Sequence, residues 1–188
     1  MRKLIVSNLV SLDGFLAGPR GEIDWFTGFA DPQFEKYAIE LLASVDTILF
    51  GRVTYELMAG YWPTAKQDAD DPRIIEAMNR LPKVVFSRTL RLASWNNTRL
   101  ANGDIVLEVG RLKEQPGKDL VIYGSGSLVS ALAPAGMIDE YRIFVAPVVL
   151  GSGKPLFRDI PRRIALKPLG TRRFGAGIIL LRYEPGST

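Results

Sequence analysis

The chain contains no cysteine and no histidine among its 188 residues. The missing cysteine excludes disulfide bonds, a thiolate nucleophile and cysteine-ligated metal or iron–sulfur centres. The missing histidine removes the commonest metal ligand, the commonest acid–base group and every Ser-His-Asp arrangement. We therefore expect no metal site, and any catalysis must use carboxylates, tyrosine, lysine, arginine or a bound cofactor.

Long apolar runs and a strong charge excess are also missing. The longest apolar stretch, Ile143 to Leu150, is well short of the roughly 20 residues that a membrane helix needs. The start, Met1-Arg2-Lys3-Leu4-Ile5-Val6, does not resemble a signal peptide, so we expect a cytoplasmic protein. The formal net charge of +4 favours anionic ligands such as phosphates but is too small for a polybasic nucleic-acid binder. We expect neither a membrane nor a nucleic-acid partner.

Short aliphatic runs alternate with amphipathic segments along the chain. Asp31-Pro32 and Asp71-Pro72 combine a helix N-cap with proline at the first helical position. They predict helices over residues 32–44 and from residue 72 to just before Pro82. Buried strands are predicted at 3–9, 47–50, 83–86, 120–123 and 140–150. Further helices are predicted over 53–60, 104–114 and 127–132, and a long loop over 11–24.

The end of the chain predicts an antiparallel strand pair, 164–169 and 178–183, joined through Gly170, Gly175 and Gly177. Strands that alternate with helices and then close on a hairpin indicate an α/β protein with a mostly parallel sheet. The sequence has no internal repeat, linker or low-complexity segment. We therefore expect a single domain over residues 1–188.

One candidate ligand motif, Gly51-Arg52-Val53-Thr54, follows a buried strand and opens a helix. Open α/β sheets bind ligands at the carboxyl ends of their strands. Free N–H groups at the helix start, the arginine and the threonine hydroxyl together suit a phosphate. A tight turn with a solvated arginine explains the same residues equally well.

Two further motifs have the same placement. Ser87-Arg88 follows the strand at 83–86, and a glycine-rich turn follows the strand at 120–123. The turn consists of Gly124, Ser125, Gly126, Ser127, Leu128 and Val129. It is not a Rossmann fingerprint, because Val129 stands where the third glycine belongs. Each motif alone is compatible with an ordinary turn, but three in one sheet favour one extended, phosphate-bearing ligand.

The carboxylates and aromatic residues leave alternatives open. Asp13 lies after the first strand, on the ligand side, but Asp-Gly is also a common turn. Glu35 lies beside the apolar stripe of the first helix, where it is either a pocket acid or an exposed first-turn glutamate. Several aromatic residues could stack on a planar heterocycle or belong to the core. They are Trp25, Phe26, Tyr61 and Trp62.

The ordered set of motifs resembles the reductase-domain family of riboflavin biosynthesis, which has the dihydrofolate reductase-like fold. The resemblance covers nearly the whole chain. It is carried by Ser11-Leu12-Asp13-Gly14, Gly51-Arg52-Val53-Thr54-Tyr55-Glu56, Gly124-Ser125-Gly126-Ser127-Leu128, and the stretch from Ile138-Asp139-Glu140-Tyr141 through Ala146 to Gly151. It implies a three-layer α/β/α arrangement and an NADPH-dependent reductase that is usually a homodimer.

The resemblance also implies roles for residues. Gly51, Arg52, Val53 and Thr54 would meet the cofactor phosphates, Ser87 and Arg88 would hold the adenosine 2′-phosphate, and Gly124 to Val129 would cradle the pyrophosphate. Asp13, Trp25, Tyr55 and Tyr123 would contact the substrate. The proton would come from Asp13, from Glu35 or from water.

The expected function is hydride transfer from NADPH to a pterin- or aminopyrimidine-type heterocycle. Two departures from the family pattern concern the substrate: Tyr123 replaces an acidic residue before the glycine pair, and Ser125 replaces the second glycine. They motivate the alternative of a non-catalytic protein that keeps only the cofactor groove.

Overall fold

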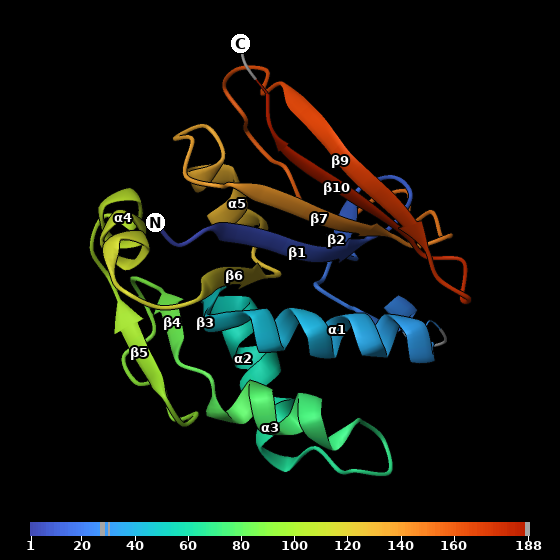
Figure 1. The fold of residues 1–188 in the computed structure, drawn as a ribbon, viewed down its shortest axis with the longest axis horizontal. Helices are drawn as coiled ribbons and strands as arrows, with labels where there is room; N and C mark the ends of the chain where they lie inside the picture. The colour runs from blue at the N-terminus through green and yellow to red at the C-terminus, as the bar shows by residue number, and fades with distance from the viewer. Residues whose placement is uncertain (27–28, 30, 187–188) are drawn as a thin grey trace.

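The computed structural model describes residues 1–26, 29 and 31–186. It contains an eight-stranded sheet with helices on both faces (Figure 1). The strand order is β5-β4-β3-β6-β1-β7-β10-β9, and β2 and β8 form a small separate pair. The strands are β1 (Leu4–Val10), β2 (Phe15–Ala17), β3 (Val45–Gly51), β4 (Lys83–Phe86), β5 (Thr98–Ala101), β6 (Asp119–Tyr123), β7 (Glu140–Val145), β8 (Lys154–Pro155), β9 (Leu166–Arg173) and β10 (Ile179–Pro185).

The sheet is parallel from β5 across to β7, and β10 and β9 continue it in antiparallel pairing. This confirms the predicted mostly parallel sheet with a C-terminal antiparallel pair. The helices are α1 (Pro32–Ser44), α2 (Arg52–Tyr61), α3 (Pro72–Arg80), α4 (Ile105–Glu114) and α5 (Gly126–Leu132). Two short 3-10 helices lie at Asp24–Phe26 and Trp62–Thr64.

Two apolar layers form on opposite faces of the sheet because successive side chains of a strand point to opposite faces. Leu4 and Val6 of β1 pack into one layer with α4 and α5. Ile5 packs into the other, with α1, α2 and α3. The helices therefore cover the sheet from both sides, and the strands between them are apolar on both faces, as buried parallel strands are.

Three of the helices begin at an aspartate that caps them. The side chains of Asp31, Asp71 and Asp104 accept hydrogen bonds from backbone N–H groups of the first turns of α1, α3 and α4. The predicted helix at 32–44 is confirmed, and the helix that begins at Pro72 ends at Arg80. By contrast, α2 and α5 begin at Gly51 and Ser125 without a side-chain cap.

Several strand predictions need correction. The strand expected over 140–150 ends at Val145, because Pro147 has no N–H to donate to a ladder. The closing strands run further than expected, and Gly170 lies inside β9 beside an irregularity of register, not in the turn. β5 was missed because its residues do not form an apolar run, and the predicted loop 11–24 contains the short strand β2.

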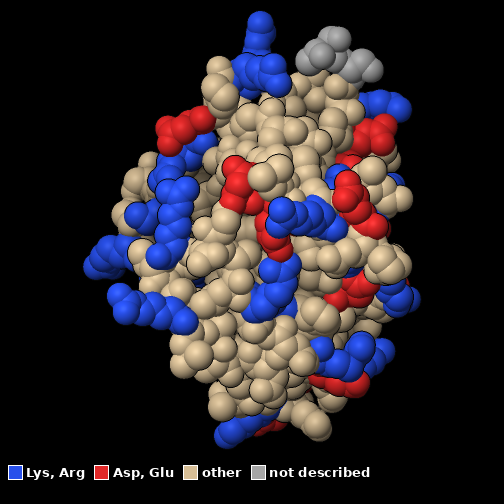
Figure 2. Space-filling model, turned by 90° about the vertical axis from the view of Figure 1, so that its left-hand side faces the viewer, with Lys and Arg blue, Asp and Glu red and all other residues tan. Residues whose placement is uncertain are grey.

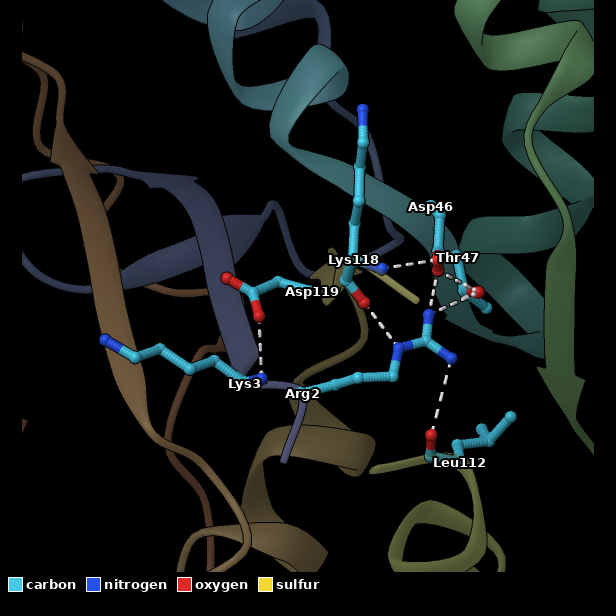
Figure 3. A network of polar contacts seen from close by, with 7 residues as sticks. All are labelled: Arg2, Lys3, Asp46, Thr47, Leu112, Lys118 and Asp119. Carbon is cyan, nitrogen blue, oxygen red and sulfur yellow. Dashed lines mark hydrogen bonds and ion pairs between the residues drawn. The ribbon is translucent and has the colours of Figure 1, made fainter. Parts of the chain in front are cut away.

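At the amino ends of β1, β3 and β6, charged groups pair with one another (Figure 3). Arg2 is 7% exposed, and its guanidinium donates to the Asp46 carboxylate, to Thr47 Oγ1 at 3.0 Å and to two backbone carbonyls. Asp46 also accepts the backbone N–H of Lys118 at 2.7 Å. Desolvation lowers the pKa of Arg2, because burial disfavours the charged form of the guanidinium. The network ties the start of β1 to β3 and to the residue before β6.

On the side of the molecule that carries α4 and β5, the surface shows both signs of charge, with some cations grouped together and others beside carboxylates (Figure 2). Arg99 pairs with Glu108 there, and Arg111 lies 3.9 Å from the same carboxylate. Around Glu108, cations and a carboxylate thus neutralise each other locally. Among the described residues, no helix has the length and apolar character needed to cross a bilayer.

Candidate active-site cleft

A large cavity of about 1530 Å³ opens at the carboxyl ends of the central strands. Its walls come from the ends of β1, β3, β4 and β6, from one side of α1, and from the first turns of α2 and α5. This is the edge at which open α/β sheets place ligands. The volume exceeds that of an ordinary single-ligand pocket of roughly 300–1,000 Å³, so the cavity has room for more than one small molecule.

The cavity collects most of the residues that the sequence singled out, although they lie far apart along the chain. Of the seventeen residues to which a catalytic, cofactor or substrate role was given, thirteen line it: Glu35, Gly51, Arg52, Val53, Thr54, Ser87, Arg88, Tyr123, Gly124, Ser125, Gly126, Ser127 and Leu128. Four others lie outside its lining: Asp13, Trp25, Tyr55 and Val129. Of the other aromatic candidates, Phe26 and Trp62 line it and Tyr61 does not. The three strand-end motifs therefore belong to one continuous site.

The glycine-rich turn is pinned from two sides. Asn8 Oδ1 accepts the Gly124 N–H at 2.5 Å, and its Nδ2 donates to the Gly124 carbonyl at 3.2 Å. Thr54 Oγ1 accepts the Ser125 N–H at 3.1 Å and so joins the starts of α2 and α5. The Thr54 hydroxyl keeps its own proton for another acceptor.

The backbone of this turn leaves no room for larger residues. Gly124 has φ of +61°, and a Cβ added there would lie 2.6 Å from the Thr54 side chain. A Cβ on Gly51 would lie 2.1 Å from Ser125 Oγ, and one on Gly126 would lie 2.6 Å from the Pro155 carbonyl oxygen. Ser125 adopts a left-handed φ of 57°, which is strained for a residue other than glycine. The turn is a tight, rigid feature of the cavity wall.

The positive end of α2 faces the cavity with its first-turn N–H groups unused by a side chain. Arg52 stands at its first position and is held by Glu56, with Nη1 2.9 Å from Oε2. Arg88 is exposed and forms no ion pair within the described part of the chain. Ser87 Oγ accepts the N–H groups of Thr89 and Leu90, which fixes the turn that carries Arg88. This half of the cavity is suited to anionic groups.

The other half of the cavity, beside α1, is aromatic. Phe34 packs edge-on against Phe144 with ring centroids 5.1 Å apart, and Tyr37 packs edge-on against the same ring at 5.4 Å. Tyr123 lies at the end of β6, where burial raises the pKa of its hydroxyl. Tyr123 therefore stays neutral at physiological pH. This half suits a flat, weakly charged ring.

Asp13 holds two loops together. Its carboxylate accepts the N–H groups of Leu150 at 3.1 Å and Gly151 at 2.7 Å, and the Ser11 hydroxyl at 2.6 Å. The hydrogen bond from Ser11 is the main reason that the pKa of Asp13 is lowered. A lowered pKa keeps the group ionised and is the opposite of what a proton donor needs at neutral pH.

The remaining predicted contacts occupy packing positions. Tyr55 is 3% exposed, and its hydroxyl accepts the Trp95 backbone N–H at 3.0 Å. Val129 is fully buried in the layer under α5. Trp25 packs edge-on against Phe26, and it is Phe26 that lines the cavity. Glu35 does line the cavity, as an exposed side chain in the first turn of α1.

Sequence reasoning missed Asn8 and Tyr37. Asn8 is the only amide in the first strand, and a polar residue that interrupts an apolar run is a usable signal for a buried hydrogen bond. Tyr37 lies on the apolar stripe of α1. Packing against the core already explains a tyrosine at that position, so the sequence does not indicate that it lines the cavity.

Comparison with known proteins agrees with this geometry. The family model described as the RibD C-terminal domain matches residues 2–180. "Uncharacterized protein YyaP" of Bacillus subtilis (strain 168) is 38% identical over 183 residues, which is 97% of this chain and 95% of that protein. The chain thus belongs to the RibD C-terminal domain family.

Solved structures show the same fold. A putative riboflavin biosynthesis protein from Shewanella sp. PV-4 superposes with a TM-score of 0.80 at 23% identity, covering 98% of this chain and 99% of that one. The dihydrofolate reductase from Enterococcus faecalis, solved in a complex with NADP(H), gives a TM-score of 0.60 at 16% identity, covering 98% and 97%. The fold is therefore that of the dihydrofolate reductase-like reductases, as the resemblance implied.

Proposed function

We propose that the protein is an NADPH-dependent reductase that transfers hydride to a pterin- or aminopyrimidine-type heterocycle. The observation that carries the proposal is the division of one cavity into an anion-binding half, built from the starts of α2 and α5 and from Arg88, and an aromatic half beside α1. The phosphates of the dinucleotide would occupy the anion-binding half, and the flat ring of the substrate would occupy the aromatic half. Nicotinamide supplies the reducing chemistry, and the protein supplies orientation.

The residues present fit this cofactor. The tight glycine-rich turn at Gly124 lets backbone approach a pyrophosphate, and the uncapped first turn of α2 offers free N–H groups. Arg88 has no competing carboxylate among the described residues and is the candidate for the 2′-phosphate. Arg52 and Thr54 would meet the cofactor phosphates.

The test is a titration with NADPH and, in parallel, with NADH, followed by energy transfer from the three tryptophans to the dihydronicotinamide. The tryptophans are Trp25, Trp62 and Trp95. Saturable binding of NADPH with much weaker binding of NADH is the expected result. Absence of binding to both would reject the proposal. Turnover is then measured with dihydrofolate and with 5-amino-6-(5-phosphoribosylamino)uracil as substrates.

A non-catalytic cofactor-binding protein is the second candidate, favoured by Tyr123 and Ser125 at positions where the family pattern differs. It predicts the same NADPH binding without cofactor consumption on any substrate of the two classes. Cytoplasmic location and the homodimer remain predictions, and light scattering of the purified protein would determine the oligomeric state.

A further inference from the structure

A buried polar cluster lies on the α1 face of the sheet, in an otherwise apolar layer. Glu140 of β7 is only 4% exposed. Arg142 of the same strand reaches it with Nε 2.8 Å from Oε1 and Nη2 3.3 Å from Oε2. Arg182 of β10 binds the same carboxylate, with Nε 2.9 Å from Oε1. Removing charged groups from water is costly even when they are paired, so stability alone does not explain why this cluster is present.

The strand pairing places the cluster next to residues that line the cavity. Ser7 of β1 lies opposite Tyr123 on one side and opposite Arg142 on the other. Arg142 in turn lies opposite Arg182. Ser7 and Tyr123 line the cavity, so Arg142 stands one strand behind that lining.

Tyr37 of α1 connects the cluster to the cavity. Its ring lines the cavity and is fixed edge-on between Phe144, at 5.4 Å, and Phe174, at 6.0 Å. Its hydroxyl oxygen accepts a hydrogen bond from Arg142 Nη1 at 3.3 Å. A guanidinium only donates, so this contact uses the oxygen and leaves the phenolic proton without a partner in the pair. The described residues provide no hydrogen-bond acceptor for that proton.

We propose that Tyr37 is the proton donor of the reduction, with Arg142 as the positioning cation behind it and Glu140 as the anchor that holds Arg142 in place. The inference rests on the proposed reductase function and assigns the proton donor, which that function does not identify. It also narrows the substrate: the reduced bond must place a hydrogen-bond acceptor, a ring nitrogen or a carbonyl oxygen, against the Tyr37 hydroxyl.

The step balances with the groups named. The electrophilic carbon of a C=N or C=O bond gains a hydride from the reduced nicotinamide, and the π electron pair moves to the heteroatom. The heteroatom takes the Tyr37 proton, so the substrate is reduced, the nicotinamide is oxidised and Tyr37 is left as a phenolate. Water from the open cavity returns the proton.

Arg142 makes this transfer favourable, because a cation 3.3 Å from the oxygen stabilises the charge that develops there. Burial alone would raise the pKa of Glu140, but the hydrogen bonds from Arg142 and Arg182 outweigh burial and leave that pKa lowered. Glu140 therefore stays ionised and keeps the guanidinium in place. A further cation, Arg172 of β9, lies 5.9 Å from the centroid of the Tyr37 ring.

The other candidates for the proton are less well placed. Asp13 lies outside the cavity lining and is held ionised by its loop contacts. Glu35 is exposed at the cavity wall and interacts electrostatically with Arg73. Among the described residues no cation hydrogen-bonds to Tyr123, and burial raises its pKa in spite of the charge of Arg142, so it is a poor donor of a proton.

The first experiment needs no substrate. Tetranitromethane reacts with phenolates, and peptide mass spectrometry reports the nitration of each tyrosine separately. We expect Tyr37 to react in the wild-type protein and to react about fivefold or more slowly in Arg142→Gln, since the nearby cation is lost. Tyr141 is the internal reference for an unreactive phenol, because burial raises its pKa to about 12. If Arg142→Gln folds poorly, Arg142→Lys is used in its place. It keeps a positive charge near Tyr37, so we expect it to retain part of the nitration rate of the wild-type protein.

The second experiment measures catalysis with whichever substrate class the wild-type protein reduces. Tyr37→Phe keeps the ring and its packing and should lower kcat by about a hundredfold or more, the usual range for losing a general acid. NADPH affinity, measured by tryptophan energy transfer, should stay within about twofold because Tyr37 lies in the aromatic half. Tyr183→Phe, on the other face of the sheet, is the matched control and should keep wild-type kcat.

The outcomes separate the two proposals. If NADPH does not bind, the proposed function fails and the proton transfer fails with it. If NADPH binds but Tyr37 is as unreactive as Tyr141, or reacts equally in Arg142→Gln, the proton transfer alone is rejected. A Tyr37→Phe protein with wild-type kcat would reject it as well.

Discussion

The two edges of the central strands use polar groups in opposite ways. At the amino edge, Arg2, Asp46 and the neighbouring backbone groups form hydrogen bonds with one another and so join the strands (Figure 3). At the carboxyl edge, α2 and α5 begin without side-chain caps, Ser125 adopts a left-handed backbone, and Arg88 has no partner among the described residues. The difference indicates that the amino edge stabilises the fold and the carboxyl edge holds the ligand, because sites of function are where locally unfavourable features persist.

The largest effect is expected at the amino edge. Arg2→Met removes the cation and leaves the Asp46 carboxylate with no guanidinium partner. We expect a loss of about 3 kcal/mol in the free energy of unfolding, near the lower end of what breaking a buried pair costs. Urea denaturation followed by circular dichroism measures it. Arg88→Ala serves as the comparison and should change stability by less than about 0.5 kcal/mol, since surface substitutions rarely do more. Equal losses in both variants would remove the contrast between the edges.

The next effect is expected at the carboxyl edge and concerns binding. Arg88→Ala should weaken NADPH binding by about 10- to 100-fold, because a hydrogen bond to a charged group contributes about 1.5–3 kcal/mol, and should leave NADH binding unchanged. Arg52→Ala should have a smaller effect, since Arg52 already shares its charge with Glu56. Fluorescence titrations of both cofactors measure this. The same loss for NADH would show that Arg88 does not read the 2′-phosphate.

A third change tests how rigid the carboxyl edge is. Gly124→Ala places a Cβ at φ of +61°, within 2.6 Å of Thr54. The left-handed conformation alone costs about 1–2 kcal/mol in residues other than glycine. We expect that loss in unfolding free energy and weaker NADPH binding together, whereas Gly60→Ala, in a helix with free space around it, should be neutral or stabilising. If NADPH binding is unchanged while the free energy of unfolding falls, the turn at Gly124 does not contact the cofactor.

The smallest effect concerns a capped helix, the counterpart of uncapped α2. Hydrogen bonds from Arg73 lower the pKa of Asp71 from 3.8 to about 2. Because the folded pKa lies below the unfolded one, this carboxylate stabilises the fold above about pH 4, and the contribution disappears as the pH falls towards about 2. Asn is nearly as good an N-cap, so Asp71→Asn isolates the charge. The stability difference between wild type and Asp71→Asn should shrink between pH 6 and pH 3, and a constant difference would contradict the assignment.

Much of the fold could be read from local sequence. Short aliphatic runs bounded by turn residues, such as Leu120 to Tyr123, indicate buried strands, and the Asp-Pro pairs mark the starts of α1 and α3 through backbone chemistry that needs no tertiary contact. The short, half-exposed β5 could not be read in this way, because its place depends on pairing with β4 and not on its own pattern. Pro147 was the local signal that would have ended β7 correctly.

The site divides in the same manner. The strand-end motifs were predictable because strand polarity alone brings them to one edge. The contact between Tyr37 and Arg142 was not, since it joins residues 105 positions apart and depends on how α1 packs over the sheet. Tyr55 shows the reverse error: its motif lies at the cavity, but helix periodicity turns its side chain into the core.

The position of β1 between β6 and β7 has a consequence for synthesis of the chain on the ribosome. Leu4 pairs with Leu120 and Ile5 with Glu140, so the first strand made lacks both neighbours until more than a hundred further residues have been added. During that interval its apolar side chains have no sheet to join, and long-range pairing of this kind slows folding. A chain that ends before β6 therefore exposes the apolar side chains of β1, and we expect such a fragment to aggregate more readily than the full-length protein.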